Sequence, residues 1–223
     1  MYQKSRPKRS RLSEVNFRKL IACFGRDLTA QDTACLLGFH RHTVSHYYTY
    51  FRSLILRECL DSQPIAGEVE VDESYFGPTR VRGKRGRGAG KKTIVFGMFK
   101  RNGHGHVYTW IVNNCQIPTI IPIINNKVLQ GSTIYSDDLG TYRFLYLQYD
   151  HKLTYHGRSQ FAEGTNHING IESFWAYAKH RMRKFKGIQK SGFLTYLKES
   201  EWRFNNRHKN IAKEVLNLIK KYR

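Results

Sequence analysis

The stretch of sequence that decides the fold is GEVEVDESYF, residues 67–76. Apolar and acidic side chains alternate along it, with Val69 and Val71 on one face and Asp72 on the other. Alternation with a period of two residues is typical of a strand that buries one of its faces. The stretch therefore predicts the first strand of a sheet, with Asp72 held rigidly on that strand.

The segments that follow predict a mixed α/β domain. Residues 93–99 and 106–112 are rich in β-branched and aromatic side chains, and the turn around Gly103 links them as a hairpin. Beyond them the pattern predicts, in order, a helix at 118–128, a strand at 131–136, a helix at 139–147, a short strand at 152–155 and helices at 169–185 and 192–206. This order describes a ribonuclease-H-like mixed sheet with flanking helices.

The residues before the sheet predict a small all-α domain at 13–60, preceded by a basic arm at 1–12. Thr29 can cap one helix, and Gly38 interrupts the helical pattern where a helix-turn-helix needs its turn. The exposed face of the second helix then offers side chains suited to a DNA major groove: Arg41, His42, Ser45 and His46. The alternative is a plain helical hairpin without a DNA-reading role.

Two further boundaries follow from local composition. Pro64 and Gly67 mark a linker at 61–67. The catalytic domain is then expected at 68–208, followed by an amphipathic C-terminal helix at 209–223.

The charge balance predicts a polyanionic partner. The chain carries 38 Lys and Arg residues against 17 Asp and Glu residues, a net charge of +21. Its apolar runs are too short to span a bilayer, and its N-terminus lacks a secretory pattern, so a nucleic acid is the expected partner, and the predicted helix-turn-helix favours double-stranded DNA. The alternative is a ribosome-associated or merely basic protein.

Several basic residues are candidates for contacts with DNA phosphates. The glycine-rich stretch TRVRGKRGRGAGKK, residues 79–92, predicts a mobile loop that folds onto the backbone. A second basic run follows residue 179. The candidates are Arg80, Arg82, Lys84, Arg85, Arg87, Lys91, Lys92, Lys179, Arg181 and Arg183.

The cysteines argue against a zinc module and against a disulfide framework. Cys23, Cys35, Cys59 and Cys115 form no pair with the spacing of a metal site. They are expected to be small buried residues in a reducing compartment, which predicts a cytoplasmic, nucleoid-associated protein.

Acidic residues on rigid elements predict the chemistry. Asp72 lies on the first strand, Asp137 and Asp138 follow the fourth, and Glu172 lies near the start of a helix. Transfer of a phosphoryl group on DNA needs an activated attacking oxygen and a stabilised leaving oxygen, which two metal ions can provide. Three carboxylates suit two Mg²⁺ (or Mn²⁺) ions, with Asp72 bridging both.

The helix that carries Glu172 offers further candidates. Lys179 lies seven residues later, two turns along the same face, where substrate DNA would run. Asn169 shares this face, one turn before Glu172. His167 is either a positioning residue or a structural histidine, and Trp175 is expected in the core.

Three motifs resemble those of bacterial insertion-sequence DDE transposases: V-D-E-S-Y-F-G, S-D-D-L-G-T-Y and H-I-N-G-I-E-S-F-W-A-Y-A-K-H-R. The resemblance covers roughly residues 65–208. It assigns the second carboxylate to Asp137, with Asp138 as the alternative, and makes Lys179 the lysine of the family signature.

The resemblance implies cleavage at transposon ends, transfer of the freed 3′ hydroxyl to target DNA, and a dimer or larger assembly on DNA. Many relatives carry an N-terminal zinc-binding module, whose cysteine pairs this chain lacks. Two alternatives remain: a catalytically silent DNA-binding descendant, and a ribonuclease-H-like nuclease without strand transfer.

Overall fold

The computed structural model describes residues 10–77, 92–137, 140–154, 167–185 and 187–223. These residues form two compact units. Of the described residues, those within 10–62 and 181–223 form the first unit, and those within 63–180 form the second. Among the described residues, no helix combines the length and the apolar character that crossing a bilayer requires.

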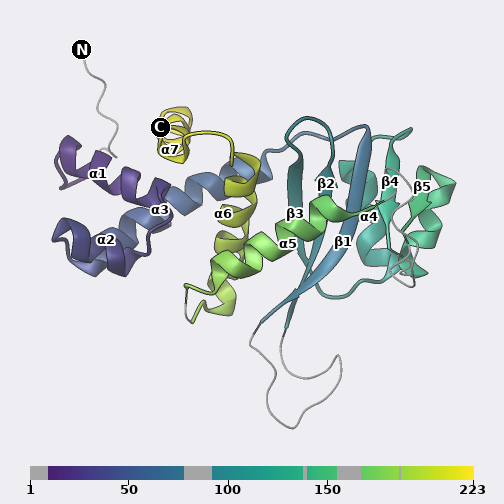
Figure 1. Cartoon of the computed structure of the whole chain (residues 1–223), viewed down its shortest axis with the longest axis horizontal. Helices are drawn as coiled ribbons and strands as arrows, with labels where there is room; N and C mark the ends of the chain where they lie inside the picture. The colour runs from purple at the N-terminus through teal and green to yellow at the C-terminus, as the bar shows by residue number, and fades with distance from the viewer. Residues whose placement is uncertain (1–9, 78–91, 138–139, 155–166, 186) are drawn as a thin grey trace, which may run out of the picture. The chain divides into compact units, whose positions relative to one another are not determined.

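The second unit is built on a five-stranded mixed sheet with the order β3-β2-β1-β4-β5 (Figure 1). Strands β1 (Glu68–Phe76), β2 (Thr93–Lys100) and β3 (His106–Val112) are antiparallel, and β4 (Thr133–Ser136) and β5 (Asp150–Leu153) are added in parallel. This architecture confirms the predicted ribonuclease-H-like fold, preceded by helices.

Opposite faces of this sheet are covered by different helices. Helix α4 (Ile117–Lys127) and the 3₁₀ helix η1 (Gly140–Leu147) pack on the face that carries Val69 and Val71. Helix α5 (Asn169–Met182) covers the other face, as the contact of Trp175 with Asp72 shows. The alternation along β1 thus separates a hydrophobic core from a polar site.

One predicted helix differs in type. Residues 139–147 were expected to form a helix, and η1 there has the tighter 3₁₀ geometry. At eight residues η1 is longer than most 3₁₀ helices, which usually run for about three or four. Tyr142 and Leu145 of η1 are buried in the sheet core, so the segment still covers the sheet as expected.

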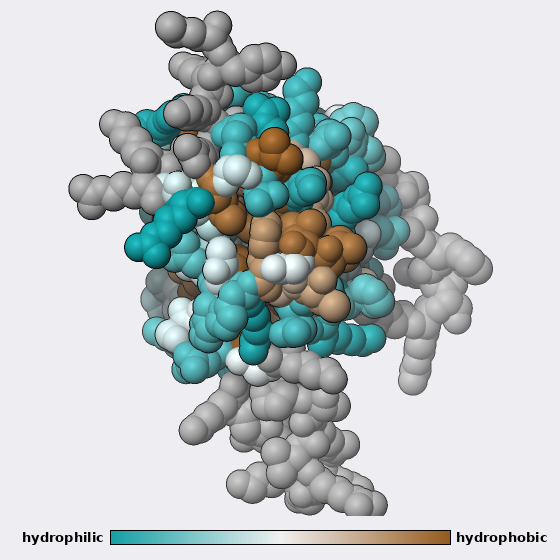
Figure 2. Space-filling view, turned by 90° about the vertical axis from the view of Figure 1, so that its left-hand side faces the viewer, coloured by the Kyte–Doolittle hydropathy of each residue, from teal (hydrophilic) through white to brown (hydrophobic). Residues whose placement is uncertain are grey.

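The first unit is all helical. It contains α1 (Glu14–Gly25), α2 (Ala30–Leu37), α3 (Arg41–Leu60), the short 3₁₀ helix η2 (Lys190–Gly192), α6 (Phe193–Asn205) and α7 (Ile211–Lys221). Thr29 caps α2 by accepting a hydrogen bond from the Asp32 amide, and Gly38 ends it in the left-handed region at φ 66°. Figure 2 shows the mainly hydrophilic face of this unit, with an apolar patch near its middle.

The position of α6 differs from the predicted division of the chain. Residues 68–208 were assigned to one domain, whereas residues 181–223 group with the N-terminal helices. The physical reason is that Trp202 of α6 joins the aromatic core formed by α1 and α3. The last two residues of α5, Arg181 and Met182, belong to this helical unit as well.

Candidate functional site

Asp72 lies near the middle of β1 and is held by two hydrogen bonds. Its Oδ2 accepts from the Trp175 indole Nε1 at 2.9 Å, and its Oδ1 accepts from the Glu73 amide at 2.8 Å. Trp175 is 5% exposed, so it is a core residue, as predicted, and also orients this carboxylate. The hydrogen bond joins residues 103 positions apart, and nothing in the local sequence indicates it.

Burial, together with the negative charges of Glu73 and Asp137, raises the pKa of Asp72 to about 7. The hydrogen bonds from Trp175 and the Glu73 amide oppose this shift but do not cancel it. The ionised form of Asp72 is therefore unfavourable in this environment unless a cation lies nearby.

Asp137 is brought to Asp72 by strand pairing. Strands β1 and β4 are parallel, with Glu68 opposite Thr133 and Glu70 opposite Tyr135. Continued by two residues beyond this pairing, the same register would place Asp137 opposite Asp72, and the negative charge of Asp137 contributes to the raised pKa of Asp72. Asp138, the alternative, lies outside the described residues.

Glu73 is a further acidic residue of this site. Its Oε2 accepts a hydrogen bond at 3.0 Å from the hydroxyl of the fully buried Tyr142. Its charge also contributes to the raised pKa of Asp72. The signal available in the sequence was only its adjacency to Asp72.

A buried ion pair fixes the start of α5. The Glu70 carboxylate is 1% exposed and accepts from the Ile171 amide at 2.8 Å, while Arg101 Nε donates to it at 2.8 Å. Arg101 also donates to the His167 carbonyl oxygen. A carboxylate at a helix N-terminus also interacts favourably with the helix dipole. Glu172, the next residue of α5, is thereby set on a fixed helix.

His167 lies beside the same carboxylate. Its Nδ1 is 3.9 Å from Glu70 Oε1, which is too long for a hydrogen bond. Among the buried side-chain atoms of the described residues, this Nδ1 has no hydrogen-bond partner. The histidine thus lies where it can influence the start of α5, and its role stays a prediction.

The exposed face of α5 carries the remaining candidates. Asn169, Glu172 and Lys179 are all exposed, at the helical spacing that the sequence predicts. The Lys179 ammonium lies 5.7 Å from the centre of the Phe76 ring. Partial burial lowers the pKa of Lys179, the negative charge of Asp72 raises it, and the positive charge of Lys92 lowers it. Two lysines are therefore within electrostatic reach of this site.

The carboxylate oxygens of the candidate ligands are suited to a hard cation, although these carboxylates are not gathered into a metal-binding cluster. No group of three or more His, Cys, Asp or Glu side chains in the described part of the chain is arranged to hold a metal ion. Asp72 and Asp137 nevertheless lie close enough for one charge to shift the pKa of the other. Oxygen-only donors with excess negative charge fit Mg²⁺ or Mn²⁺.

Gly97 makes room for the tryptophan that holds Asp72. It lies opposite Asp72 on β2, and a Cβ atom placed on it would be 2.6 Å from the Trp175 ring. Gly97→Ala is therefore expected to lower the free energy of unfolding by about 1–3 kcal/mol and to displace the indole from Asp72. Thermal unfolding and near-UV circular dichroism measure both effects.

The matched control is Gly140→Ala, because a Cβ atom on Gly140 meets nothing within 4 Å. Equal stability of the two variants would show that the Trp175 ring can move aside without cost.

The candidate DNA-contacting residues fall into three groups. Arg41, His42 and His46 are exposed on α3, Ser45 is half-buried there, and Arg183 is exposed after α5. Arg80, Arg82, Lys84, Arg85, Arg87 and Lys91 lie outside the described residues.

Arg181 requires a correction. It was predicted to contact DNA phosphates, but its side chain is only 2% exposed. It donates to Asp27 Oδ1 at 2.8 Å and to Glu199 Oε1 at 2.5 Å. A guanidinium that is buried and ion-paired in this way is not presented to DNA.

Comparison with known proteins identifies a family and a relative that this chain resembles. Residues 64–205 match the family model of the ISXO2-like transposase domain, which covers more than half of the chain. A Haemophilus influenzae protein named "uncharacterized transposase-like protein" is 46% identical over 101 residues. That match covers 45% of this chain and 81% of the relative.

Proposed function

This chain belongs to the ISXO2-like transposase domain family, and we propose that it cleaves the ends of an insertion sequence and transfers the freed 3′ hydroxyl to target DNA. The observation that carries this proposal is electrostatic: the charge of Asp137 shifts the pKa of Asp72, and the charge of Asp72 shifts the pKa of Lys179. Lys179 lies on helix α5, whose first turn is fixed by Glu70. Because the chain is a transposase-family protein, DNA is its partner.

We propose Asp72, Asp137 and Glu172 as the residues that hold two Mg²⁺ or Mn²⁺ ions. When bound, such ions supply an activated attacking oxygen at neutral pH and stabilise the charge of the leaving oxygen. The raised pKa of Asp72 supports this assignment, because a nearby divalent cation would favour its ionised form.

The other residues are assigned to positioning. Trp175 orients the Asp72 carboxylate through its indole N–H, and Glu70 with Arg101 holds the helix that carries Glu172. Lys179 and Lys92 would bind phosphate oxygens of the strand, because a lysine ammonium donates to phosphate as a point charge. Asn169 and His167 are supporting candidates at the N-terminal end of α5.

End recognition is assigned to the helical unit. Helices α2 and α3 would act as a helix-turn-helix, with Arg41, His42, Ser45 and His46 facing base edges and Arg183 on the backbone. A homodimer or larger assembly would bring two transposon ends together. The basic stretch 79–92 would add phosphate contacts.

The test is strand transfer with purified protein, Mg²⁺ or Mn²⁺, a labelled duplex carrying the DNA that flanks its own gene, and a target plasmid. New joints are sequenced. The wild-type protein is expected to make joints that disappear with Asp137→Asn and persist with Asp138→Asn, because only Asp137 is assigned to the ions. Binding of the same duplex is expected to be nearly unchanged in both variants.

Other outcomes would redirect the assignment. Joints that survive Asp137→Asn and vanish with Asp138→Asn would move the second carboxylate to Asp138. Cleavage without joints would indicate a nuclease, and DNA binding with neither would indicate a silent descendant.

A further inference from the structure

A polar pocket of about 410 Å³ lies within the helical unit, beside the exposed face of α3. Its α3 wall is formed by Arg41, Ser45, Thr49 and Arg52. These residues follow one another at intervals of four, four and three, so they make a single stripe along the helix. The stripe starts among the side chains proposed to face DNA bases.

Arg52 supplies unused hydrogen-bond donors at the inner end of this stripe. Its side chain is 9% exposed and its Nε donates to Glu199 at 2.7 Å. Its guanidinium carbon lies 4.2 Å from the centre of the Tyr196 ring, which also lines the pocket. Among the described residues, Arg52 makes no other hydrogen bond, so its terminal N–H groups are available to a ligand in the pocket.

The ion-pair cluster behind Arg52 carries an excess of positive charge. Within the described part of the helical unit, Glu199 and Asp27 share their ion pairs with four cations: Arg52, Arg181, Arg203 and Lys184. Charges in a partly buried cluster are screened much less than charges in solvent. This excess therefore favours a bound anion.

The start of α2 adds a second favourable wall. Thr29, Ala30 and Gln31 line the pocket at the N-terminus of this eight-residue helix. Backbone N–H groups at a helix start, together with the helix dipole, favour anionic ligands. The Asp32 carboxylate of the same turn accepts a hydrogen bond from the Thr29 hydroxyl and is not among the residues that line the pocket.

We propose that this pocket binds one phosphodiester group of duplex DNA and thereby sets the register of α3 on the transposon end. The proposal rests on the DNA-binding part of the proposed function. The Arg52 guanidinium, the Thr49 hydroxyl and the N-terminus of α2 are groups of the kind that proteins use on the DNA backbone. A phosphate held at the inner end of the stripe would leave Arg41, His42 and His46 to face the bases.

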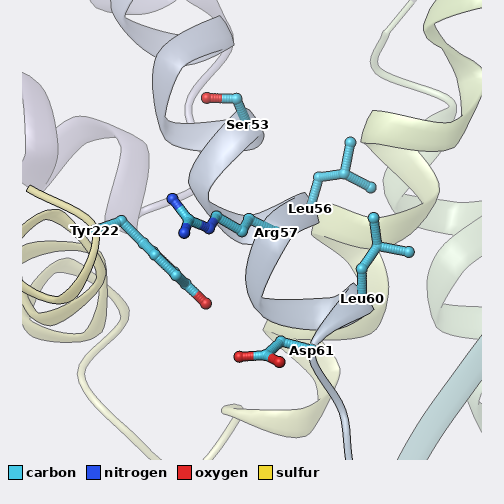
Figure 3. Close-up of a pocket in the computed structure, with 6 residues that line it drawn as sticks. All are labelled: Ser53, Leu56, Arg57, Leu60, Asp61 and Tyr222. Carbon is cyan, nitrogen blue, oxygen red and sulfur yellow. The ribbon is translucent and has the colours of Figure 1, made fainter.

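A second pocket on α3 provides a contrast. It has a volume of about 480 Å³ and is lined by Leu56, Leu60 and Asp61 together with Arg57, which stacks on Tyr222 at 4.3 Å (Figure 3). The Asp61 carboxylate in this lining opposes an anion. Ser53, which lines this second pocket, is exposed on the same helix and offers a matched control.

The test compares Thr49→Glu and Gln31→Glu with Ser53→Glu in the full chain. All three positions are exposed, and each change adds one negative charge. Glutamate is well tolerated in helices, and it is favourable at a helix start such as position 31, so folding is expected to persist. Binding of a labelled duplex is measured by anisotropy from 50 to 200 mM salt, and circular dichroism checks the fold.

Thr49→Glu and Gln31→Glu are each expected to weaken binding about tenfold or more, and to lower the slope of log affinity against log salt by about 0.9, the value for one phosphate contact. Ser53→Glu is expected to leave the slope unchanged. If the two pocket variants bind DNA with the wild-type slope, the pocket assignment is overturned while the proposed function stands. A wild-type protein that binds no duplex would overturn both.

A parallel experiment distinguishes between two ligands of the pocket, a phosphate of DNA and a free anion. Thermal unfolding is measured in inorganic phosphate and in chloride of equal ionic strength. Stabilisation of wild type by phosphate, combined with unchanged DNA binding in the two pocket variants, would assign the pocket to a small anion and overturn the DNA assignment.

Discussion

Asp72→Asn is expected to reduce strand cleavage and transfer by about 10³-fold or more while leaving duplex binding nearly unchanged. Asparagine has the same shape, and its carbonyl oxygen can still accept from the Trp175 indole, whereas its amide NH2 group replaces the oxygen that accepts from the Glu73 amide, so that one hydrogen bond is lost. It cannot carry the negative charge that holds a divalent cation. Cleavage rates and anisotropy with the same duplex measure the two effects.

The same substitution is expected to stabilise the metal-free protein at high pH. The folded pKa of Asp72 is about 7, above its ordinary value of 3.8, so the folded state binds the extra proton between these values. Stability therefore falls as pH rises from about 4 to 7, and the cost, up to about 4 kcal/mol, persists above pH 7. Asparagine avoids this cost, so the variant should unfold at a higher temperature than wild type at pH 8 and not at pH 4.

Glu68→Gln is the matched control for both measurements. Glu68 lies on the same strand and accepts a hydrogen bond from the Tyr135 hydroxyl at 2.9 Å, which glutamine can also accept. It is expected to keep wild-type activity. Cleavage that survives Asp72→Asn at more than a tenth of the wild-type rate would remove Asp72 from the catalytic set.

Glu199→Gln is expected to destabilise the helical unit by about 3–5 kcal/mol, because it leaves buried cations without their shared anion. Glu199 is fully buried and accepts from Arg52 at 2.7 Å and from Arg203 at 2.8 Å, with Arg181 as its third partner. Chemical denaturation followed by circular dichroism measures the loss.

The pH dependence of the free energy of unfolding should also change in Glu199→Gln. The positive charges of Arg181, Arg203 and Arg52 outweigh burial and hold the pKa of Glu199 well below its ordinary value of 4.5. Its contribution is therefore complete above about pH 4.5 and is lost as pH falls below it. The variant should lack this acid-dependent loss.

Glu14→Gln is the control for this effect, because the exposed Glu14–Arg18 pair should contribute less than about 1 kcal/mol. Equal destabilisation by Glu14→Gln and Glu199→Gln would show that the buried cluster is not a main source of stability.

The sheet was largely predictable because its signals are local. Alternation along residues 67–76 indicated β1, and the hairpin around Gly103 indicated the antiparallel pairing of β2 and β3. Side-chain periodicity reports which face of an element is buried, and this information is carried by neighbours in the chain. The acidic candidates were found for the same reason, since each lies at a recognisable point of a strand or helix.

The partners of these residues were not predictable, because they are brought together from distant positions. Trp175 donates to Asp72 across 103 residues, and Glu70 accepts from the Ile171 amide across 101. Arg181 illustrates the resulting error: its sequence context is a basic run on a helix, yet its acidic partner Asp27 lies 154 residues away. A charge pattern does not reveal whether a side chain meets solvent or a buried carboxylate.

The sequence by itself therefore determined the order and type of most elements, the excess of positive charge and the acidic residues on rigid positions, because each depends on local spacing or composition. Only the tertiary structure decided that Asp72 has a raised pKa, that Arg181 is buried and that α6 packs with the N-terminal helices. These properties depend on which distant groups exclude water around a charge, and that is a consequence of packing in three dimensions.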